Sequence, residues 1–538
     1  MIHPVRPTSL PANRWVARLC RLALAVAWLS GVGSSVSAQP LDVTSMTIAD
    51  LNRLFEAGTL TSAQLVQQYL DRVKAYDQAG PRLNAVITMN PNALATAREL
   101  DAERASTGPR SALHGVPIVL KDNIDTADLP TTAGSVLLRG SRPPDDAFVV
   151  RRLRAAGAIV IAKVNMSEFA SGGAVSSLGG PTRNPHDVTR TPSGSSGGTG
   201  AAIAAAYAQF GLGTDTGGSV RLPSTANGIV GLKPTLGLVS RDGIVPLALS
   251  FDTAGPMARS VYDVAAALGV MAGSDPADEA TRKGEGHVEG DYTRFLDRGA
   301  LQGARIGVAR DFLGQDSEVD WIVEASLEAM RRAGATVIDV TLPTWLLDAN
   351  TDLYTTVRHR EFRAQIAAYL ETLPQDGPKT LEALIAQSIR LTSPDAHGQP
   401  NPARWSLMRR EEDSGELSDH EYRAVHEYGL PLVQTIVDGL LESEALDAIV
   451  YPTMPRRPPR VDVDPGAAGD GGRSPIRFAN LTGFPDLVVP AGFTANGAPV
   501  GLSFLGRAFS EPRLLAIGYA FEQTTRARRL PVTTPALP

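Results

Sequence analysis

The stretch TPSGSSGGTG at residues 191–200 and the stretch GTDTGGSVR at residues 213–221 decide how the rest of the chain is interpreted. Both are rich in Gly, Ser and Thr, a composition that is otherwise typical of flexible linkers. The linker interpretation fails because residues 201–207 favour a small-residue helix and residues 229–232 are apolar. Small residues in a core segment let backbones approach each other and a substrate closely. We therefore predict that this part of the chain is folded and carries a functional site.

The first candidate is Ser196, the centre of a G-x-S-x-G pattern. Such a pattern forms a nucleophile elbow only when a strand comes directly before it. Residues 184–192 contain two prolines and predict a loop instead, so the elbow is disfavoured. A phosphate-binding loop is also disfavoured, because no lysine follows the glycines.

The second candidate is Ser219, which follows two glycines after the apolar residues 210–212. Successive glycines let backbone N–H groups converge into a concave anion site. The N–H groups of Thr216, Gly217, Gly218 and Ser219 are candidates to hold the oxyanion of a tetrahedral intermediate, where losing one donor costs about 10²–10³ in rate. On these residues alone, a glycine-rich turn without chemistry is an equally good interpretation.

The third candidate is Lys121, which ends the apolar segment 116–120. Burial disfavours the ammonium form and lowers the pKa of a lysine. A general base at neutral pH needs a lysine pKa of about 7–8, which is about 4 kcal/mol from the usual value of about 10.4. Alone, this position is better explained as an exposed lysine at a strand end.

Taken together, these motifs resemble the amidase signature family. Residues 184–260 match almost without gaps through GSSGG, GTDTGGS, GIVGLKPT, GLVSRDG and DTAGPMARS. Outside that region, LHGVPIVLKDNI, AKVNMSEFA, PDLVVPAGF and PVGLSFLGR also look like family segments, so the resemblance covers residues 46–526. It implies a single large α/β domain with a central mixed β-sheet flanked by helices.

The resemblance also implies a triad without histidine. Ser219 would be the nucleophile, Ser195 would bridge from a cis peptide bond, and Lys121 would accept the proton through Ser195. Asp215 and Arg221 would brace the nucleophile loop, and Arg221 is also a candidate to meet a substrate carboxylate. Ser196 is a further supporting position in this scheme. The resemblance implies no cofactor and no metal, and none of the eight histidines has a known metal spacing.

Within the family, the chain looks most like the peptide amidases, which remove C-terminal amides from peptides. AGPRLNAVITMNP at residues 79–91 and SEPRLLAIGYAFEQTTRARR near the C-terminus carry this likeness, whereas TGGSVRLPS follows the general family pattern. The predicted function is hydrolysis of a carboxamide through a seryl acyl-enzyme, with a small molecule or a peptide amide as substrate. Aryl acylamides, fatty amides and small aliphatic amides stay open as substrates, and an esterase stays open as an alternative, whereas the signal peptide predicted at the N-terminus argues against the amidotransferase subunit that acts on charged tRNA. A non-enzymatic binding protein is disfavoured, because it would not need Lys121 together with Ser219.

The remaining segments predict helices that alternate with short apolar strands, an α/β pattern. Residues 346–441 are more charged than the rest of the chain and are predicted as a helical insertion that covers the site. Residues 456–474, which are rich in Pro and Gly, are predicted as a surface loop. The predicted helices are residues 46–57, 61–73, 92–104, 147–156, 201–207, 260–271, 319–333 and one from 511. The predicted strands are residues 83–88, 116–120, 158–164, 305–308, 337–340, 487–489 and 500–505.

The N-terminus predicts export. Four arginines and no acidic residue come before the apolar residues 22–29, and small residues follow, so we predict a signal peptide at residues 1–38 that is cut after Ala38. The amidase domain would then be residues 39–538, without the single cysteine, Cys20, and without stable membrane association after cleavage. Net charge is −6, which argues against nucleic acid as a partner. The mature protein would be periplasmic or secreted, and the sequence does not set its oligomeric state.

Overall fold

The computed structural model describes residues 1, 3, 42–373, 377–391, 401–461 and 473–537. Residues 42–537 form one compact unit, which contains every element named below. Apart from positions 1 and 3, the predicted signal peptide and its cleavage position lie outside the described residues. The same holds for residues 462–472 of the predicted surface loop. No helix among the described residues combines the length and the apolar character needed to cross a membrane.

The centre of the fold is a mixed sheet, which confirms the predicted fold class. Within the described residues it has eleven strands, and β2 pairs in parallel with β3 and β6 while β6, β8, β7, β12 and β13 pair antiparallel in that order. In spatial order the strands are β1 (Val86–Met89), β3 (Ile159–Val164), β2 (Pro117–Lys121), β6 (Phe210–Asp215), β8 (Thr253–Ala258), β7 (Val230–Lys233), β12 (Asp486–Phe493), β13 (Pro499–Leu505), β11 (Ala448–Pro452), β9 (Arg305–Ala309) and β10 (Thr336–Val340). A separate hairpin joins β4 (Val175–Ser176) to β5 (Gly180–Pro181).

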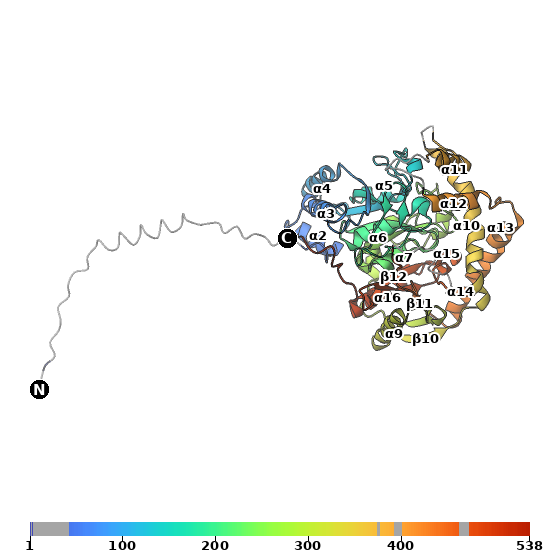
Figure 1. Ribbon diagram of the computed structural model, residues 1–538. Coiled ribbons are helices and arrows are strands. Elements are labelled where there is room, and N and C mark those ends of the chain that lie inside the picture. Colours follow the sequence, from blue (N-terminus) through green and yellow to red (C-terminus); the bar gives the residue numbers. More distant parts are fainter. Residues whose placement is uncertain (2, 4–41, 374–376, 392–400, 462–472, 538) are drawn as a thin grey trace. The chain divides into compact units, whose positions relative to one another are not determined.

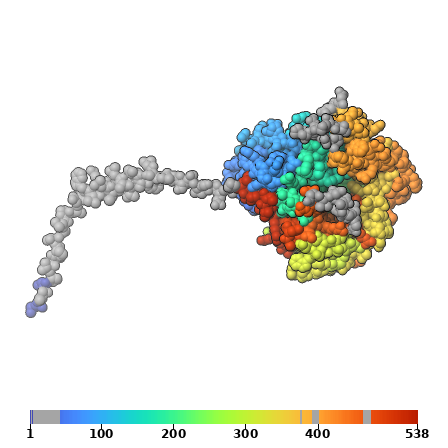
Figure 2. All heavy atoms as spheres, in the orientation of Figure 1, coloured from blue at the N-terminus to red at the C-terminus, as the bar shows by residue number. Residues whose placement is uncertain are grey.

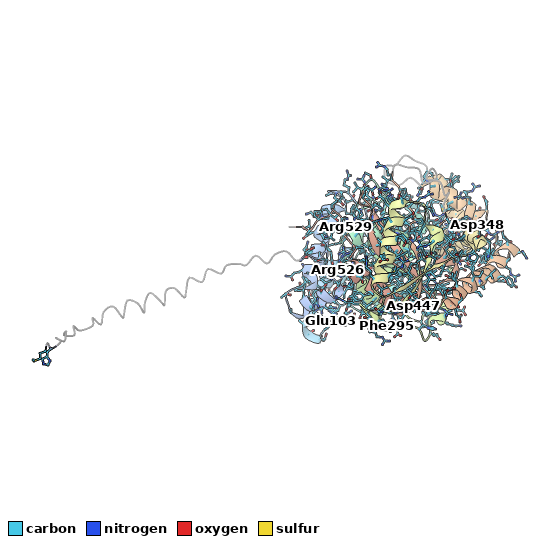
Figure 3. All side chains as sticks on the ribbon, turned by 90° about the horizontal axis from the view of Figure 1, so that it is seen from below. Glu103, Phe295, Asp348, Asp447, Arg526 and Arg529 are labelled. Atoms are coloured by element: carbon cyan, nitrogen blue, oxygen red, sulfur yellow. The ribbon has the colours of Figure 1, made fainter. Side chains whose placement is uncertain are left out.

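Helices surround this sheet (Figure 1). They are α2 (Ile48–Glu56), α3 (Ser62–Tyr76), α4 (Ala93–Thr107), α5 (Phe148–Ala155), α6 (Gly197–Ala204), α7 (Arg221–Ala226), α8 (Val261–Met271), α9 (Ser317–Arg332), α10 (Thr344–Thr372), α11 (Leu381–Arg390), α12 (Pro402–Glu412), α13 (His420–Ala424), α14 (Leu430–Ser443), α15 (Phe478–Thr482) and α16 (Glu511–Thr525). A capping box begins α3, because the side chains of Thr61 and Gln64 accept hydrogen bonds from each other's backbone N–H groups. Figure 3 draws the described side chains, and in this view Glu103 of α4 and Asp348 of α10 lie on opposite sides of the folded part.

Glycines on the central strands let α6 and α7 lie unusually close to the sheet. A Cβ on Gly211 would come within 2.7 Å of Thr199, and one on Gly231 within 2.1 Å of the Ser224 hydroxyl. Because side chains alternate along a strand, these positions share the face that the two small helices cover. Gly255 and Gly501 meet comparable obstacles, so the Gly-rich composition of the sequence serves close packing.

Six of the described strands were not predicted, namely β4, β5, β6, β7, β8 and β11. β8 reads TAGPMA, which lacks the β-branched and aromatic residues that favour strands, yet all six residues are buried. β11 reads AIVYP and is also fully buried between β13 and β9. In addition, α6 begins at Gly197, four residues before the predicted start. The prediction began too late because residues 197–200 contain three glycines, which favour a loop.

The described residues of the region predicted as a helical insertion form the helices α10 to α14, and residues 374–376 and 392–400 of that region lie outside the described residues. In Figure 2 part of it (orange) forms the surface on the side away from α2 to α4 (blue). Phe362 and Ile366 of α10 pack in one cluster with Met166, Phe169 and Leu247 from loops of the body. That this region covers the site as a lid stays a prediction.

Candidate active site

Lys121 lies at the end of β2 with its side chain fully buried. Its Nζ is 2.7 Å from Ser195 Oγ, 2.7 Å from Thr214 Oγ1 and 3.3 Å from the Thr214 carbonyl oxygen. Burial lowers the pKa of Lys121 to about 7, and the carboxylates of Asp215 and Asp252 only partly oppose this shift. The interpretation as an exposed strand-end lysine is therefore wrong, and the lowered pKa favours the neutral amine that a general base needs.

Ser195 lies on the loop that leads into α6, after a cis peptide bond between Gly194 and Ser195. This bond agrees with the one that the resemblance implied. The Ser195 carbonyl oxygen accepts a hydrogen bond from the Ser167 N–H at 3.0 Å, and a Cβ on Gly194 would come within 2.4 Å of the Ser167 hydroxyl. The segment around Ser167 thus holds the loop that presents Ser195 to Lys121.

Ser219 lies in the loop between β6 and α7 and is half-buried, so its side chain is reachable from solvent. Its carbonyl oxygen accepts a hydrogen bond from the Ser196 N–H at 3.2 Å. This bond joins the two serine loops directly above the end of β6. The structure therefore brings Lys121, Ser195 and Ser219 together near the C-terminal ends of the neighbouring strands β2 and β6.

The predicted set of oxyanion donors is too large by one residue. The Gly218 N–H donates to Asp215 Oδ1 at 2.8 Å, because the carboxylate folds under the loop and accepts from it. Among the described residues, no partner is found for the N–H groups of Thr216, Gly217 and Ser219. These three remain candidates for the oxyanion hole.

Arg221 and Asp215 form a fully buried brace beneath the nucleophile loop. Asp215 accepts from Arg221 at 3.1 and 3.2 Å, and Arg221 also donates to Asp486 at 2.8 Å and to Asn480 at 2.7 Å. Burial alone would raise the pKa of Asp215, but Arg221 and Asn480 hold it well below its usual range. The prediction that Arg221 could meet a substrate carboxylate is wrong, because its side chain has no exposure and already faces two carboxylates.

Ser196 points into the core and not into the site. Ser196 is the N-cap residue of α6. Its Oγ lies 3.3 Å from the backbone nitrogen of Thr214 and 3.3 Å from the Thr214 carbonyl oxygen. It is fully buried, so a substrate carbonyl cannot reach it. The support that Ser196 gives is therefore a contact between α6 and β6.

The sequence interpretation missed three polar side chains that surround Lys121. Thr214 contacts its Nζ, Asn123 donates to Thr214 Oγ1 at 3.1 Å, and Asp252 accepts from the Thr216 hydroxyl and from two backbone N–H groups at 2.8 and 2.9 Å. Burial raises the pKa of Asp252 to about 6. The three stand in LHGVPIVLKDNI, GTDTGGS and DTAGPMARS, so their place in these family motifs was the available signal.

Two side chains form the wall over the glycines of the nucleophile loop. A Cβ on Gly217 would come within 2.6 Å of the Tyr354 hydroxyl, and one on Gly218 within 2.2 Å of Ile476. Tyr354 belongs to α10 and stacks on Phe251 at 5.2 Å. Only glycine fits at these two positions of the loop. Through Tyr354, the helical region lies directly against the nucleophile loop. Within the described part of the chain, no group of three or more His, Cys, Asp or Glu side chains could hold a metal ion.

Comparisons with known proteins agree with this geometry. A family model described as amidase matches residues 64–515. The peptide amidase of Stenotrophomonas maltophilia superposes with a TM-score of 0.82 at 41% identity, over 91% of this chain and 99% of that one. An amidase family protein from Bacillus anthracis has a TM-score of 0.80 and 32% identity, over 90% and 92% of the chains. A glutamyl-tRNA(Gln) amidotransferase subunit from Halorhodospira halophila is 36% identical over 501 residues, or 89% and 97% of the chains.

Proposed function

Since this chain belongs to the amidase family and hydrolyses carbon–nitrogen bonds other than peptide bonds, we propose that its substrates are peptides with a C-terminal carboxamide. The observation that carries the chemistry is the buried Lys121, whose Nζ lies 2.7 Å from Ser195 Oγ. A backbone hydrogen bond joins the loop of Ser195 to the loop of Ser219, the serine that solvent can reach. The likeness to a peptide amidase at 41% identity supports the substrate class.

In the proposed acylation, Ser219 Oγ attacks the amide carbon and forms the new C–O bond. Its proton passes to Ser195, while the Ser195 proton passes to the neutral amine of Lys121. The same relay then returns a proton from Lys121 to the amide nitrogen, the C–N bond breaks, and ammonia leaves. Such a relay splits one difficult hydrolysis into two easier steps.

Deacylation uses the same groups in reverse. A water molecule gives its proton to Ser195 and attacks the ester carbonyl on Ser219, and the released Ser219 oxygen regains a proton. In both steps the developing oxyanion would be held by the N–H groups of Thr216, Gly217 and Ser219. Losing one donor of this kind costs about 10²–10³ in rate. The buried Asp215–Arg221 brace keeps the loop in place, so little reorganisation is needed.

Ammonia release from a substrate panel tests this proposal. The panel contains C-terminally amidated dipeptides, the matching methyl esters, simple aliphatic amides, anilides and free glutamine. We expect ammonia from the amidated dipeptides at a kcat/KM at least tenfold above that for the other amides. Turnover of anilides or aliphatic amides alone would reject the peptide class but keep the amidase.

The remaining members of the panel test two alternatives. Faster cleavage of the esters only, without ammonia from any amide, would favour an esterase. Ammonia from glutamine alone would favour a role like that of the amidotransferase subunits among the relatives. For every substrate in the panel, the purified Ser219→Ala protein at the same concentration is the background control.

We also propose that the protein is exported, as its N-terminal sequence predicts. The support is the arginine-rich start, the short apolar run at residues 22–29 and the small residues that end at Ala38. Peptides with amidated C-termini would then be met outside the cytoplasm, and the mature chain would carry no cysteine to oxidise there.

A further inference from the structure

Tyr354 of α10 places its hydroxyl over the loop that carries Ser219. A Cβ on Gly217 would come within 2.6 Å of the hydroxyl oxygen, which therefore lies against the glycine two residues before Ser219. In the part of the chain that the structure describes, this hydroxyl has no hydrogen-bond partner, and its oxygen is in contact with solvent. Tyr354 as a whole is only 9% exposed. A tyrosine hydroxyl in such a place usually has a partner, and a bound substrate can supply one.

The ring that carries this hydroxyl is fixed by two neighbours. Phe251 stacks on the ring of Tyr354 with the two centroids 5.2 Å apart, and the guanidinium of Arg477 lies 5.0 Å from the Tyr354 centroid. Phe251 comes directly before Asp252, which accepts a hydrogen bond from the Thr216 hydroxyl of the nucleophile loop. The ring and the loop are thus held together, so a group that binds the hydroxyl pays little conformational entropy for ordering it.

The same face of α10 also reaches the support of the Ser195 loop. Arg358 lies one helical turn after Tyr354, on the same face of the helix, and donates to Ser171 Oγ at 2.8 Å. Ser171 follows Ser167, whose N–H bonds the Ser195 carbonyl oxygen. One face of α10 therefore contacts the segments that carry or support both serines. The Tyr354 hydroxyl consequently borders the space where the acyl part of a substrate on Ser219 must lie.

We propose that the Tyr354 hydroxyl is a substrate-binding group that hydrogen-bonds the peptide unit preceding the scissile carboxamide. This inference rests on the proposed function, because it takes Ser219 as the nucleophile and an amidated peptide as the substrate. A hydroxyl can donate to the carbonyl oxygen of that peptide unit or accept from its N–H. The unit is joined to the Cα beside the carbon that Ser219 attacks, and a simple aliphatic amide has no such group. Tyr354 would therefore set the preference for peptides over simple amides.

The substitution Tyr354→Phe tests this role with two matched substrates. It removes the hydroxyl and keeps the ring that stacks on Phe251. The substrates are acetyl-leucine amide and isocaproamide, which is the same acyl chain without the acetylamino group. Ammonia release gives kcat/KM for each substrate, and an effect common to both cancels in their ratio. We expect kcat/KM for acetyl-leucine amide to fall about three- to tenfold, as loss of one neutral hydrogen bond does, and that for isocaproamide to change by less than about twofold.

The matched control is Tyr369→Phe, the same substitution on the same helix. The Tyr369 hydroxyl donates to Asp125 Oδ1 at 2.9 Å, so its loss removes a hydrogen bond within the protein. Tyr369→Phe should lower the midpoint of thermal unfolding and leave the ratio of the two kcat/KM values unchanged. Tyr354→Phe should do the opposite, because its hydroxyl has no partner within the described chain.

The outcomes separate a failure of this inference from a failure of the proposed function. If the unsubstituted protein prefers acetyl-leucine amide and Tyr354→Phe keeps that preference, the inference alone is wrong. Equal losses on both substrates, together with a lowered unfolding midpoint, would show that the hydroxyl is structural and would also overturn it. If the unsubstituted protein does not prefer acetyl-leucine amide over isocaproamide, the peptide substrate class is rejected and the inference falls with it.

Discussion

At the scale of single residues, Ser196 and Ser219 are joined by a backbone hydrogen bond but have different roles. Ser219 is reachable and has no side-chain partner among the described residues, whereas Ser196 is buried against Thr214. Ser219→Ala should lower kcat at least about 10⁴-fold, as loss of a nucleophile does in other triads. Ser196→Ala removes only long hydrogen bonds and should lower kcat about tenfold or less. Steady-state kinetics of both variants, with circular dichroism as the folding control, would contradict this assignment if Ser196→Ala were the more damaging change.

Lys121 couples activity to stability, and the sign follows from its pKa. The pKa is about 7 in the folded protein and 10.5 in the unfolded chain, so the unfolded state binds more protons between these two pH values. Stability therefore rises with pH across that window, and the burial of Lys121 destabilises the protein most below pH 7.

Lys121→Met should consequently abolish turnover but stabilise the fold at low pH. The buried charge costs about 4 kcal/mol near pH 7, and the lost hydrogen bonds take back about 1 kcal/mol each. We expect a net gain of about 1 kcal/mol at pH 6.5 that disappears by pH 10.5. Urea unfolding at both pH values measures this, and equal effects at the two pH values would show that Lys121 does not change its protonation on folding.

The triad positions follow from sequence motifs, but the residues that hold them in place do not. The resemblance gives Arg221 a bracing role, yet its partners Asp486 and Asn480 lie more than 250 residues further along the chain. Without a second sequence for comparison, nothing ties such distant positions together. The same limit applies to Tyr354, whose hydroxyl meets Gly217 only after α10 has packed onto the body.

At the scale of elements, the site depends on how closely two small helices approach the sheet. Gly231 on β7 leaves room for Ser224 of α7, and a Cβ there would lie 2.1 Å from the Ser224 hydroxyl. Gly231→Ala should thus displace α7 and the preceding Ser219 loop, with a loss of about 1–3 kcal/mol and of most activity. The control Gly439→Ala lies at an exposed position of α14, where nothing is within 4 Å of the new Cβ, and should gain up to about 1 kcal/mol. Thermal unfolding of both variants tests this, and a neutral Gly231→Ala would show that α7 does not need the close approach.

Elements with clear periodicity were predicted well, and those shaped by close packing were not. α8 and α9 follow from helical spacing, and β2 and β3 from short apolar runs. β8 was missed because glycine, proline and alanine stand where strand formers are expected, and its burial only becomes clear once α6 and α7 lie over it. Strand propensity measures how well a residue fits a half-buried sheet surface, whereas all six residues of β8 are fully buried.

At the scale of the whole molecule, one sheet carries the entire site. The resemblance predicted a single mixed sheet, and the order of its strands explains why Lys121 and Ser219 meet, since β2 and β6 are parallel neighbours whose ends lie side by side. The strand order itself could not be predicted, because chain order and spatial order differ at most positions. Export is a separate proposal at this scale.

Mass spectrometry of protein secreted or released by osmotic shock tests export. We expect a mature N-terminus at Gln39, because Val36 and Ala38 provide the small residues that signal peptidase requires. A variant with Ala38→Arg should accumulate uncut, since a large charged side chain does not fit that position. Full-length protein that stays in the cytoplasm with its first residues intact would contradict the proposal.

The central claim is that an amide substrate passes through an ester on Ser219. The most direct measurement is rapid acid quenching of the enzyme during turnover of an amidated peptide, followed by peptide mapping. We predict an acyl group on the peptide that contains Ser219, formed with one equivalent of ammonia and absent from Ser219→Ala. An acyl group on Ser195 or Ser196, or amide turnover by Ser219→Ala at the unsubstituted rate, would contradict it.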